Sequence, residues 1–268
     1  MAPNVTMALK STQPQIRQFD DVEALSCAAA DQVCRVASDA IATQARGTIV
    51  LAGGSTPRRL YEVLATPAYL GKVPWKKIEF FWGDERMVPP QHRDSNFQMA
   101  YTALLSRIFG PQEHVHRIPT ECGVPEVAAR RYEGEIARAF GIAPGAPPPS
   151  FDLILLGLGT DGHTASLFPN TEALDATTRW VVANRGPLPH VERVTMTAGI
   201  LNAARHVIFL VTGPEKAAVL AQVLEGPCDF CRLPAQMIRP TSGDVTWYVD
   251  RAAASKLAQV TGNGGPDK

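Results

Sequence analysis

The stretch TIVLAGGSTPRRLYEVL, Thr48 to Leu64, decides the fold. It begins with a short apolar run, Thr48 to Ala52, of the kind found in strands that are covered on both faces of a sheet. The turn GGSTP follows, and we expect a helix over Arg58 to Leu64. A strand that passes through a glycine-rich turn into a helix is the unit from which parallel α/β sheets are built.

The same alternation of strand and helix continues along the chain. Further strands are expected over Ile78–Trp82, Phe151–Leu156, Trp180–Ala183, His206–Thr212 and Val245–Val249. Further helices are expected over Asp21–Ala45, Asn96–Arg107, Glu126–Phe140 and Glu215–Leu224. This pattern predicts an α/β fold of three layers, α/β/α, around a mostly parallel, Rossmann-like sheet.

One domain is expected to span residues 1–268, because no stretch reads as a long linker. Gly141 to Ser150 contains APGAPPP and is expected to be a surface connection, since prolines lack the amide proton that helices and central strands need. The segment after Val260 is expected to be disordered.

Composition excludes several classes of function. Lysine plus arginine and aspartate plus glutamate both number 26, so we expect no nucleic-acid surface, and no obligate protein partner is evident. The opening MAPNVTMALKSTQPQ lacks a signal-peptide core and no later segment could span a membrane, which predicts a cytoplasmic protein. The five cysteines are scattered and are expected to be reduced thiols, including the lone CxxC pair of Cys228 and Cys231.

The GGSTP turn is a candidate phosphate site. Gly53 and Gly54 let the backbone turn sharply and approach a ligand, while Thr56 is expected to serve as the N-cap of the helix. The free amides of the helix start, together with the hydroxyls of Ser55 and Thr56, would form an anion pocket. An ordinary capped turn between a strand and a helix explains the same residues, and the turn alone does not decide between the two.

A second glycine-rich loop, GLGTDGHTASLFP, follows the strand Phe151–Leu156. Its glycines match the dinucleotide-binding spacing GxGxxG, but Asp161 would oppose a pyrophosphate and Pro169 interrupts the helix that should follow. We therefore interpret the loop as a tight turn at the ligand-binding edge of the sheet, where His163 is either a proton acceptor or an ordinary surface histidine, and spacing alone does not decide between the two. Asp161 either orients the imidazole or holds the turn through an Asx-type hydrogen bond.

Several motifs, in order, resemble the 6-phosphogluconolactonase family over almost the whole chain. They are GGSTP, WGDERMVP (Trp82–Pro89), DSN (Asp94–Asn96), GLGTDGHTASLFP, ERVTMT (Glu192–Thr197), VTGPEK (Val211–Lys216), LPAQ (Leu233–Gln236) and WYVD (Trp247–Asp250). The resemblance implies a fold shared with glucosamine-6-phosphate deaminase and ribose-5-phosphate isomerase. It also implies a carboxylic ester hydrolase that opens 6-phospho-D-glucono-1,5-lactone in the oxidative pentose phosphate pathway.

The deaminase is the main rival, because it resembles this chain in the phosphate turn and in the DGH element. It carries DEY where this chain has Asp84-Glu85-Arg86, and a catalytic glutamate where this chain has Phe168. Phe168 cannot move a proton, whereas Arg86 suits a negative charge developing on an ester carbonyl. A third alternative is a non-catalytic sugar-phosphate sensor, but no DNA-binding module fits before residue 45.

The resemblance assigns roles that need neither a metal nor a cofactor. Phosphate would dock at Gly53 to Thr56 and Lys216, with Arg193 as a second phosphate partner. His163 would take a proton from the attacking water, and Arg86 would stabilise the oxyanion. Asp84 and Glu85 either aim Arg86 or cap the loop, and Ser95 and Asn96 are expected to start the following helix.

Overall fold

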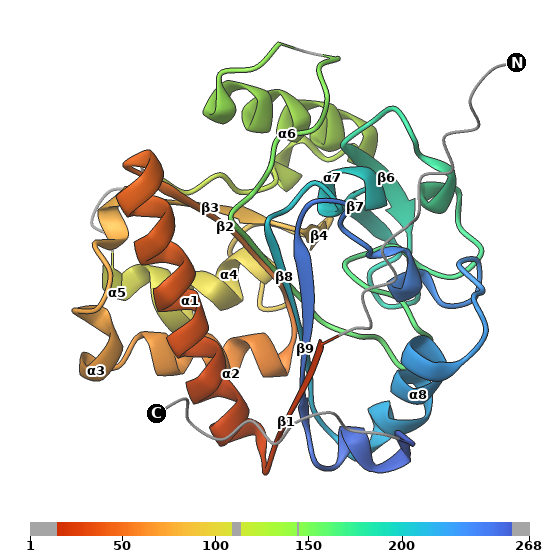
Figure 1. The fold of residues 1–268 in the computed structure, drawn as a ribbon. Coiled ribbons are helices and arrows are strands. Elements are labelled where there is room, and N and C mark those ends of the chain that lie inside the picture. Colours follow the sequence, from red (N-terminus) through yellow and green to blue (C-terminus); the bar gives the residue numbers. More distant parts are fainter. Residues whose placement is uncertain (1–14, 109–113, 144, 259–268) are drawn as a thin grey trace, which may run out of the picture.

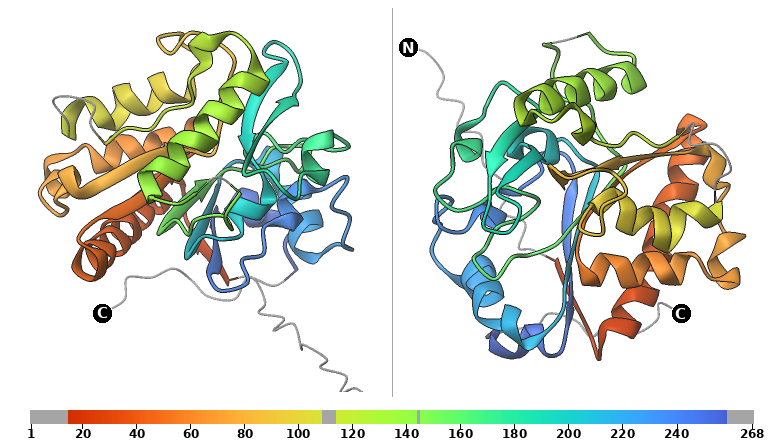
Figure 2. Two further views of the ribbon diagram at one scale, coloured as in Figure 1. Left: turned by 90° about the horizontal axis from the view of Figure 1, so that it is seen from above. Right: turned by 180° about the vertical axis from the view of Figure 1, so that it is seen from behind.

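The computed structural model describes residues 15–108, 114–143 and 145–258. Its main sheet has six strands in the order β1-β9-β8-β5-β2-β3, and every pairing in it is parallel. The strands are β1 (Gln15–Phe19), β2 (Gly47–Leu51), β3 (Ile78–Trp82), β5 (Leu153–Leu156), β8 (His206–Val211) and β9 (Asp244–Asp250). Helices lie on both sides of this sheet (Figures 1 and 2), so the predicted three-layer α/β/α fold is confirmed.

The described part of the chain also holds a second, smaller sheet that the sequence did not predict. It is antiparallel and consists of β4 (Asp84–Arg86), β7 (Glu192–Met196) and β6 (Val181–Arg185). The expected strand Trp180–Ala183 corresponds to β6, so its expected place in the parallel sheet was wrong. The pairing of β6 with β7 explains this, because Val181 and Ala183 lie opposite Met196 and Val194.

The helices agree closely with those expected. The longer ones are α1 (Val22–Gln44), α2 (Ser55–Leu64), α6 (Pro125–Phe140) and α8 (Ala217–Glu225). Helix α4 (Asn96–Ala100) continues through a π-helical turn (Tyr101–Leu105) into α5 (Ser106–Ile108), and α3 (Pro67–Leu70) and α7 (Ala198–Leu201) are single turns. Short 3-10 turns cover Trp75–Lys77, Thr120–Cys122, Glu172–Asp175, Pro214–Lys216, Pro234–Met237 and Ala253–Lys256.

The two faces of the main sheet have different covers. Helices α1, α2 and α4 lie on one side, whereas α8 and the small sheet lie on the other (Figures 1 and 2). Alternate side chains of β3 pack in both directions: Trp82 meets Phe97 of α4 at 5.5 Å between ring centroids, and Phe81 meets Phe140 of α6 at 6.0 Å. Both faces of the sheet are therefore buried, which matches its near-continuous apolar strands.

Helix α2 begins earlier than expected, and this corrects the role of Thr56. The helix starts at Ser55 with Gly54 as N-cap, so Thr56 lies inside the first turn and does not cap it. Instead, the Thr56 hydroxyl hydrogen-bonds the hydroxyl of Thr212 at 2.7 Å. The glycine can take the cap position because its φ of 102° is open only to a residue without a Cβ.

Three further expectations were tested in part. Gly141–Ser150 forms neither helix nor strand over its described residues, as a connection should, and all five cysteines are free thiols. The segment after residue 260 lies outside the described residues. Among the described helices, none combines the length and apolar character that crossing a membrane requires.

The order of the strands places the ligand-binding edge. The chain moves from β2 outward to β3 and then returns to β5 on the other side of β2. This change of direction opens a crevice beyond the carboxyl ends of β2 and β5, which is where open α/β sheets bind ligands. The loops that follow β2, β5 and β8 all begin at this edge.

Candidate active site

A cavity of about 230 Å³ lies at the carboxyl ends of β2, β5 and β8. Its floor includes Leu155, Leu156, Leu210 and Val211 from β5 and β8. The cavity is also lined by every residue predicted for the site except Asp161: Gly53, Gly54, Ser55, Thr56, Arg86, His163, Arg193 and Lys216. Residues from five separate segments of the sequence, 53–56, 86, 155–163, 193 and 210–216, therefore line one space.

The turn after β2 is held close to the start of α4. A Cβ built on Gly53 would overlap the side-chain amide of Asn96, with Cγ at 2.5 Å and Nδ2 at 2.9 Å. Asn96 is buried and donates from Nδ2 to the backbone oxygen of Asp84 at 2.9 Å and to its Oδ1 at 3.2 Å. Gly53 is thus required for close approach, and the first amides of α2 have no acceptor within the helix.

The loop after β8 resembles the turn after β2 in its backbone. Gly213 has a φ of 100°, close to the 102° of Gly54, and the 3-10 turn Pro214–Lys216 follows it. The carboxylate of Asp250 accepts from the amide of Gly213 at 3.1 Å, which fixes the loop that carries Lys216. The sequence predicts no role for Asp250, because nothing in it places β9 beside this loop.

His163 and Asp161 form a close pair in the loop after β5. Nδ1 of His163 lies 2.5 Å from Oδ1 of Asp161, and the same oxygen accepts from the His163 amide at 3.2 Å. Asp161 therefore contacts the imidazole and also closes an Asx-type turn. Burial by itself raises the pKa of Asp161, but the hydrogen bond and charge of His163 outweigh it and hold this pKa below its ordinary value.

No helix begins between Gly157 and Pro169, a stretch that is described in full, so the GxGxxG spacing does not form a dinucleotide turn. The glycines instead shape the loop. A Cβ on Gly159 would overlap the imidazole of His163 and lie 2.6 Å from Oδ1 of Asp161, and Gly162 has a φ of 85°.

Arg86 and Arg193 lie directly opposite each other, because they are register partners in the pairing of β4 with β7. Nη1 of Arg86 donates to the backbone oxygen of Asp94 at 2.7 Å, and Nε of Arg193 donates to the backbone oxygen of His190 at 2.7 Å. The buried Nε of Arg86 has no hydrogen-bond partner among the described residues. Burial lowers the pKa of Arg193, and the nearby charge of Arg86 acts in the same direction.

The ring of Phe168 contacts both His163 and Arg193. Its ring centroid lies 4.5 Å from that of His163 and 5.5 Å from the guanidinium carbon of Arg193. The aromatic ring therefore holds both groups in position without exchanging a proton. The sequence had assigned no positioning role to Phe168.

Glu85 holds the start of a helix, whereas Asp84 accepts from the hydroxyl of Ser166 at 2.6 Å and lines the cavity. The Glu85 carboxylate accepts from the amides of Arg86, Asn96 and Phe97, each at 2.8 Å, so it caps the start of α4. Burial raises the pKa of Glu85, and these hydrogen bonds oppose that effect. Ser95 is the N-cap of α4, as expected, with its hydroxyl accepting from the amide of Gln98 at 3.1 Å.

A three-layer α/β fold with a glycine-rich turn and a histidine at the switch point of the sheet defines the class of α/β proteins that bind a ligand at this edge. The family model described as "Glucosamine-6-phosphate isomerases/6-phosphogluconolactonase" matches residues 20–247. The chain belongs to this family.

Individual relatives favour one branch of the family. A 6-phosphogluconolactonase from Nostoc sp. is 44% identical over 244 residues, which cover 91% of this chain and 98% of the relative. The solved structure of 6-phosphogluconolactonase from Trypanosoma cruzi is 33% identical and has a TM-score of 0.81, covering 92% of this chain and 98% of that one. A monomeric glucosamine-6-phosphate deaminase is 22% identical with a TM-score of 0.73, covering 90% and 99%, and shares the fold.

Proposed function

We propose that this protein is a 6-phosphogluconolactonase, which hydrolyses 6-phospho-D-glucono-1,5-lactone to 6-phospho-D-gluconate. The observation that carries the proposal is the single cavity that His163 and two arginines share with the GGSTP turn and Lys216. Homologues named for this activity cover almost the whole chain at up to 44% identity, which supports the same conclusion.

The phosphate end of the substrate docks between the turns that follow β2 and β8. The hydrogen bond between Thr56 and Thr212 joins these two turns at 2.7 Å, so their anion-binding groups form one site. Amides at the start of α2 and the ammonium group of Lys216 supply the positive potential that a phosphate monoester needs. No metal or cofactor has a role in this step.

Hydrolysis proceeds by attack of water on the lactone carbonyl carbon. With Nδ1 of His163 directed to Asp161, Nε2 is the nitrogen that accepts the proton from water as the new C–O bond forms. The carbonyl oxygen becomes an oxyanion, which the positive charge of Arg86, a residue that lines the cavity, stabilises. The intermediate then collapses, the ring C–O bond breaks, and His163 returns its proton to the departing hydroxyl oxygen.

We assign Arg193 to the acyl end of the substrate instead of the phosphate end. It contacts Phe168, the ring that also contacts His163, and it lies opposite Arg86 in the small sheet. The sequence had suggested Arg193 as a phosphate partner, and the geometry favours the other end of the cavity.

Deamination of glucosamine 6-phosphate is the rival reaction, and the position of Phe168 argues against it. Ring opening by that route would need a proton-transferring group beside the histidine, and a phenyl ring occupies that place at 4.5 Å. A shared fold does not separate the two reactions, because function lies in the site.

The assay generates 6-phosphogluconolactone in situ, subtracts spontaneous hydrolysis and compares wild type with His163→Ala. Loss of a general base should lower kcat by about 10²–10⁴-fold. His206→Ala is the matched control, because His206 also pairs with an aspartate, Asp244 at 2.9 Å, but lies at the opposite end of β8. Equal lactone decay with and without protein would reject the assignment and favour a sensor, and ammonia release from glucosamine 6-phosphate would favour the deaminase.

A further inference from the structure

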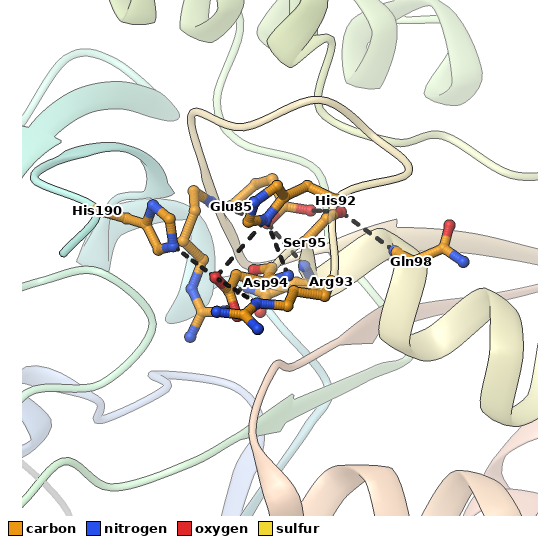
Figure 3. Close-up of polar contacts among 9 residues, drawn as sticks. Glu85, His92, Arg93, Asp94, Ser95, Gln98 and His190 are labelled. Atoms are coloured by element: carbon orange, nitrogen blue, oxygen red, sulfur yellow. Dashed lines mark hydrogen bonds and ion pairs between the residues drawn. The ribbon is translucent and has the colours of Figure 1, made fainter.

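His92, Asp94 and His190 form a cluster outside the cavity (Figure 3). One ligand atom from each of the three lies within 4.8 Å of those of the other two. Nε2 of His190 is 2.8 Å from Oδ2 of Asp94, and Nδ1 of His92 is 3.7 Å from the same oxygen. Two imidazoles and a carboxylate from two different loops therefore converge on one point.

These atoms are spaced as the ligands of a transition metal are. Metal–ligand bonds of about 2.0–2.1 Å in a tetrahedron put neighbouring ligand atoms about 3.4 Å apart. Two of the three separations, 2.8 Å and 3.7 Å, bracket that value, and the third is within 4.8 Å. Nδ1 of His92 accepts a hydrogen bond from the amide of Asp94 at 3.1 Å, so this nitrogen carries no proton, and an ion bound to it would replace that hydrogen bond.

The surroundings allow an ion to enter. All three residues are partly exposed, so a bound ion would keep water on its remaining coordination position. Among the described residues, the one arginine or lysine paired with the Asp94 carboxylate is Arg93, whose Nε lies 3.8 Å from Oδ2 and whose side chain is 90% exposed. An ion would replace the proton shared by His190 and Asp94.

The cluster is connected to the active site through the backbone. The Asp94 carbonyl accepts from Arg86, and the His190 carbonyl accepts from Arg193. The side chains of the same two residues face each other in the cluster. An ion bound there would tie together the two loops that hold the arginines.

We propose that His92, Asp94 and His190 bind a divalent transition metal ion such as Zn²⁺, at a structural site that fixes the two arginine-bearing loops. Imidazole and carboxylate ligands suit Zn²⁺, Ni²⁺ and Co²⁺. The ion does not contact the substrate, because none of its three ligands lines the cavity.

The test measures Zn²⁺ binding to the full-length, tag-free chain by competition with a chromophoric chelator. Cys228 and Cys231 are exposed thiols, so the measurement is repeated in the Cys228→Ser/Cys231→Ser background. We expect one Zn²⁺ per chain in both backgrounds. The melting temperature should rise with Zn²⁺ concentration, because the ion binds the folded state.

Ligand variants identify the site. His190→Ala and Asp94→Asn should each weaken Zn²⁺ affinity about tenfold or more, whereas His206→Ala should leave it unchanged. Circular dichroism without metal confirms that each variant is folded. The proposal is refuted if the ligand variants bind Zn²⁺ as tightly as wild type, or if wild type shows no saturable binding up to about 1 mM. Lactone hydrolysis is not measured, so either result leaves the proposed enzymatic function standing.

Discussion

Replacement of Gly53 by alanine is expected to damage both the stability of the fold and the phosphate turn. The new methyl group would lie 2.5 Å from Cγ of Asn96, a distance that Cβ atoms do not tolerate. Asn96 cannot simply rotate away, because it is buried and its Nδ2 donates two hydrogen bonds to Asp84. Either those bonds break or the turn moves.

The loss in the free energy of unfolding can be worked out from the interactions that Gly53→Ala disrupts. Two buried hydrogen bonds contribute about 1 kcal/mol each, and residual overpacking adds about 1 kcal/mol, so the free energy of unfolding should fall by about 3 kcal/mol. The turn bears the amides proposed to bind phosphate. A displacement that weakens phosphate binding by about 1.4 kcal/mol would raise KM for the lactone about tenfold.

Urea denaturation of a double-mutant cycle measures this coupling. Asn96→Ala alone loses the two hydrogen bonds, but it also removes the side-chain amide that a Cβ at position 53 would overlap. The double variant should therefore have nearly the same free energy of unfolding as Asn96→Ala. Gly83→Ala is the control: it lines the same cavity, and its new Cβ would meet only Val50 Cγ1 at 3.7 Å and Leu51 O at 3.9 Å. Additive free energies for Gly53→Ala and Asn96→Ala would refute the reasoning.

Two other predictions concern charge. Lys216→Gln should raise KM for the lactone about tenfold or more with little change in kcat, because a charged hydrogen bond to phosphate acts equally on ground and transition states. Steady-state kinetics measures both constants. An effect on kcat alone would contradict the prediction. Burial alone lowers the pKa of His116, but its hydrogen bonds to Glu79 (2.7 Å) and Glu135 (2.8 Å) raise it overall. His116→Gln should therefore lower the free energy of unfolding by about 1–3 kcal/mol at pH 5.5, which is below the unfolded pKa of about 6.5. The loss should become smaller as pH rises through the folded pKa. Equal losses in urea denaturation at pH 5.5 and 9 would contradict this prediction.

The main sheet could be predicted from sequence because its strands are short apolar runs buried on both faces. Strand β1 was not predicted, because it is an edge strand in which only Ile16 and Phe19 are buried. It therefore lacks a continuous apolar run. Strand β4 is three polar or charged residues, Asp84–Arg86, and its conformation depends on pairing with β7 more than a hundred residues later. Local sequence carries no signal of such a distant partner.

The candidate site could likewise be predicted only in part from the sequence. Residues whose position follows from a loop at a strand end, such as His163 and Lys216, could be expected to share the cavity once a parallel sheet was assumed. The adjacency of Arg86 and Arg193 could not, because it depends on the register of the small sheet. The contacts of Phe168 with both His163 and Arg193 likewise required three-dimensional coordinates.

The pairing of Arg86 with Arg193 bears directly on the proposed mechanism. Like charges directly opposite each other across two strands repel. Burial lowers the pKa of Arg193, the charge of Asp84 opposes this effect, and the charge of Arg86 adds to it. Backbone carbonyls hold both guanidiniums in place but carry no full negative charge. A neutral lactone carbonyl would relieve little of the repulsion, whereas a tetrahedral oxyanion would relieve much more. In the proposed mechanism the arginine pair would therefore favour the transition state over the bound substrate, which is the condition for an electrostatic contribution to kcat.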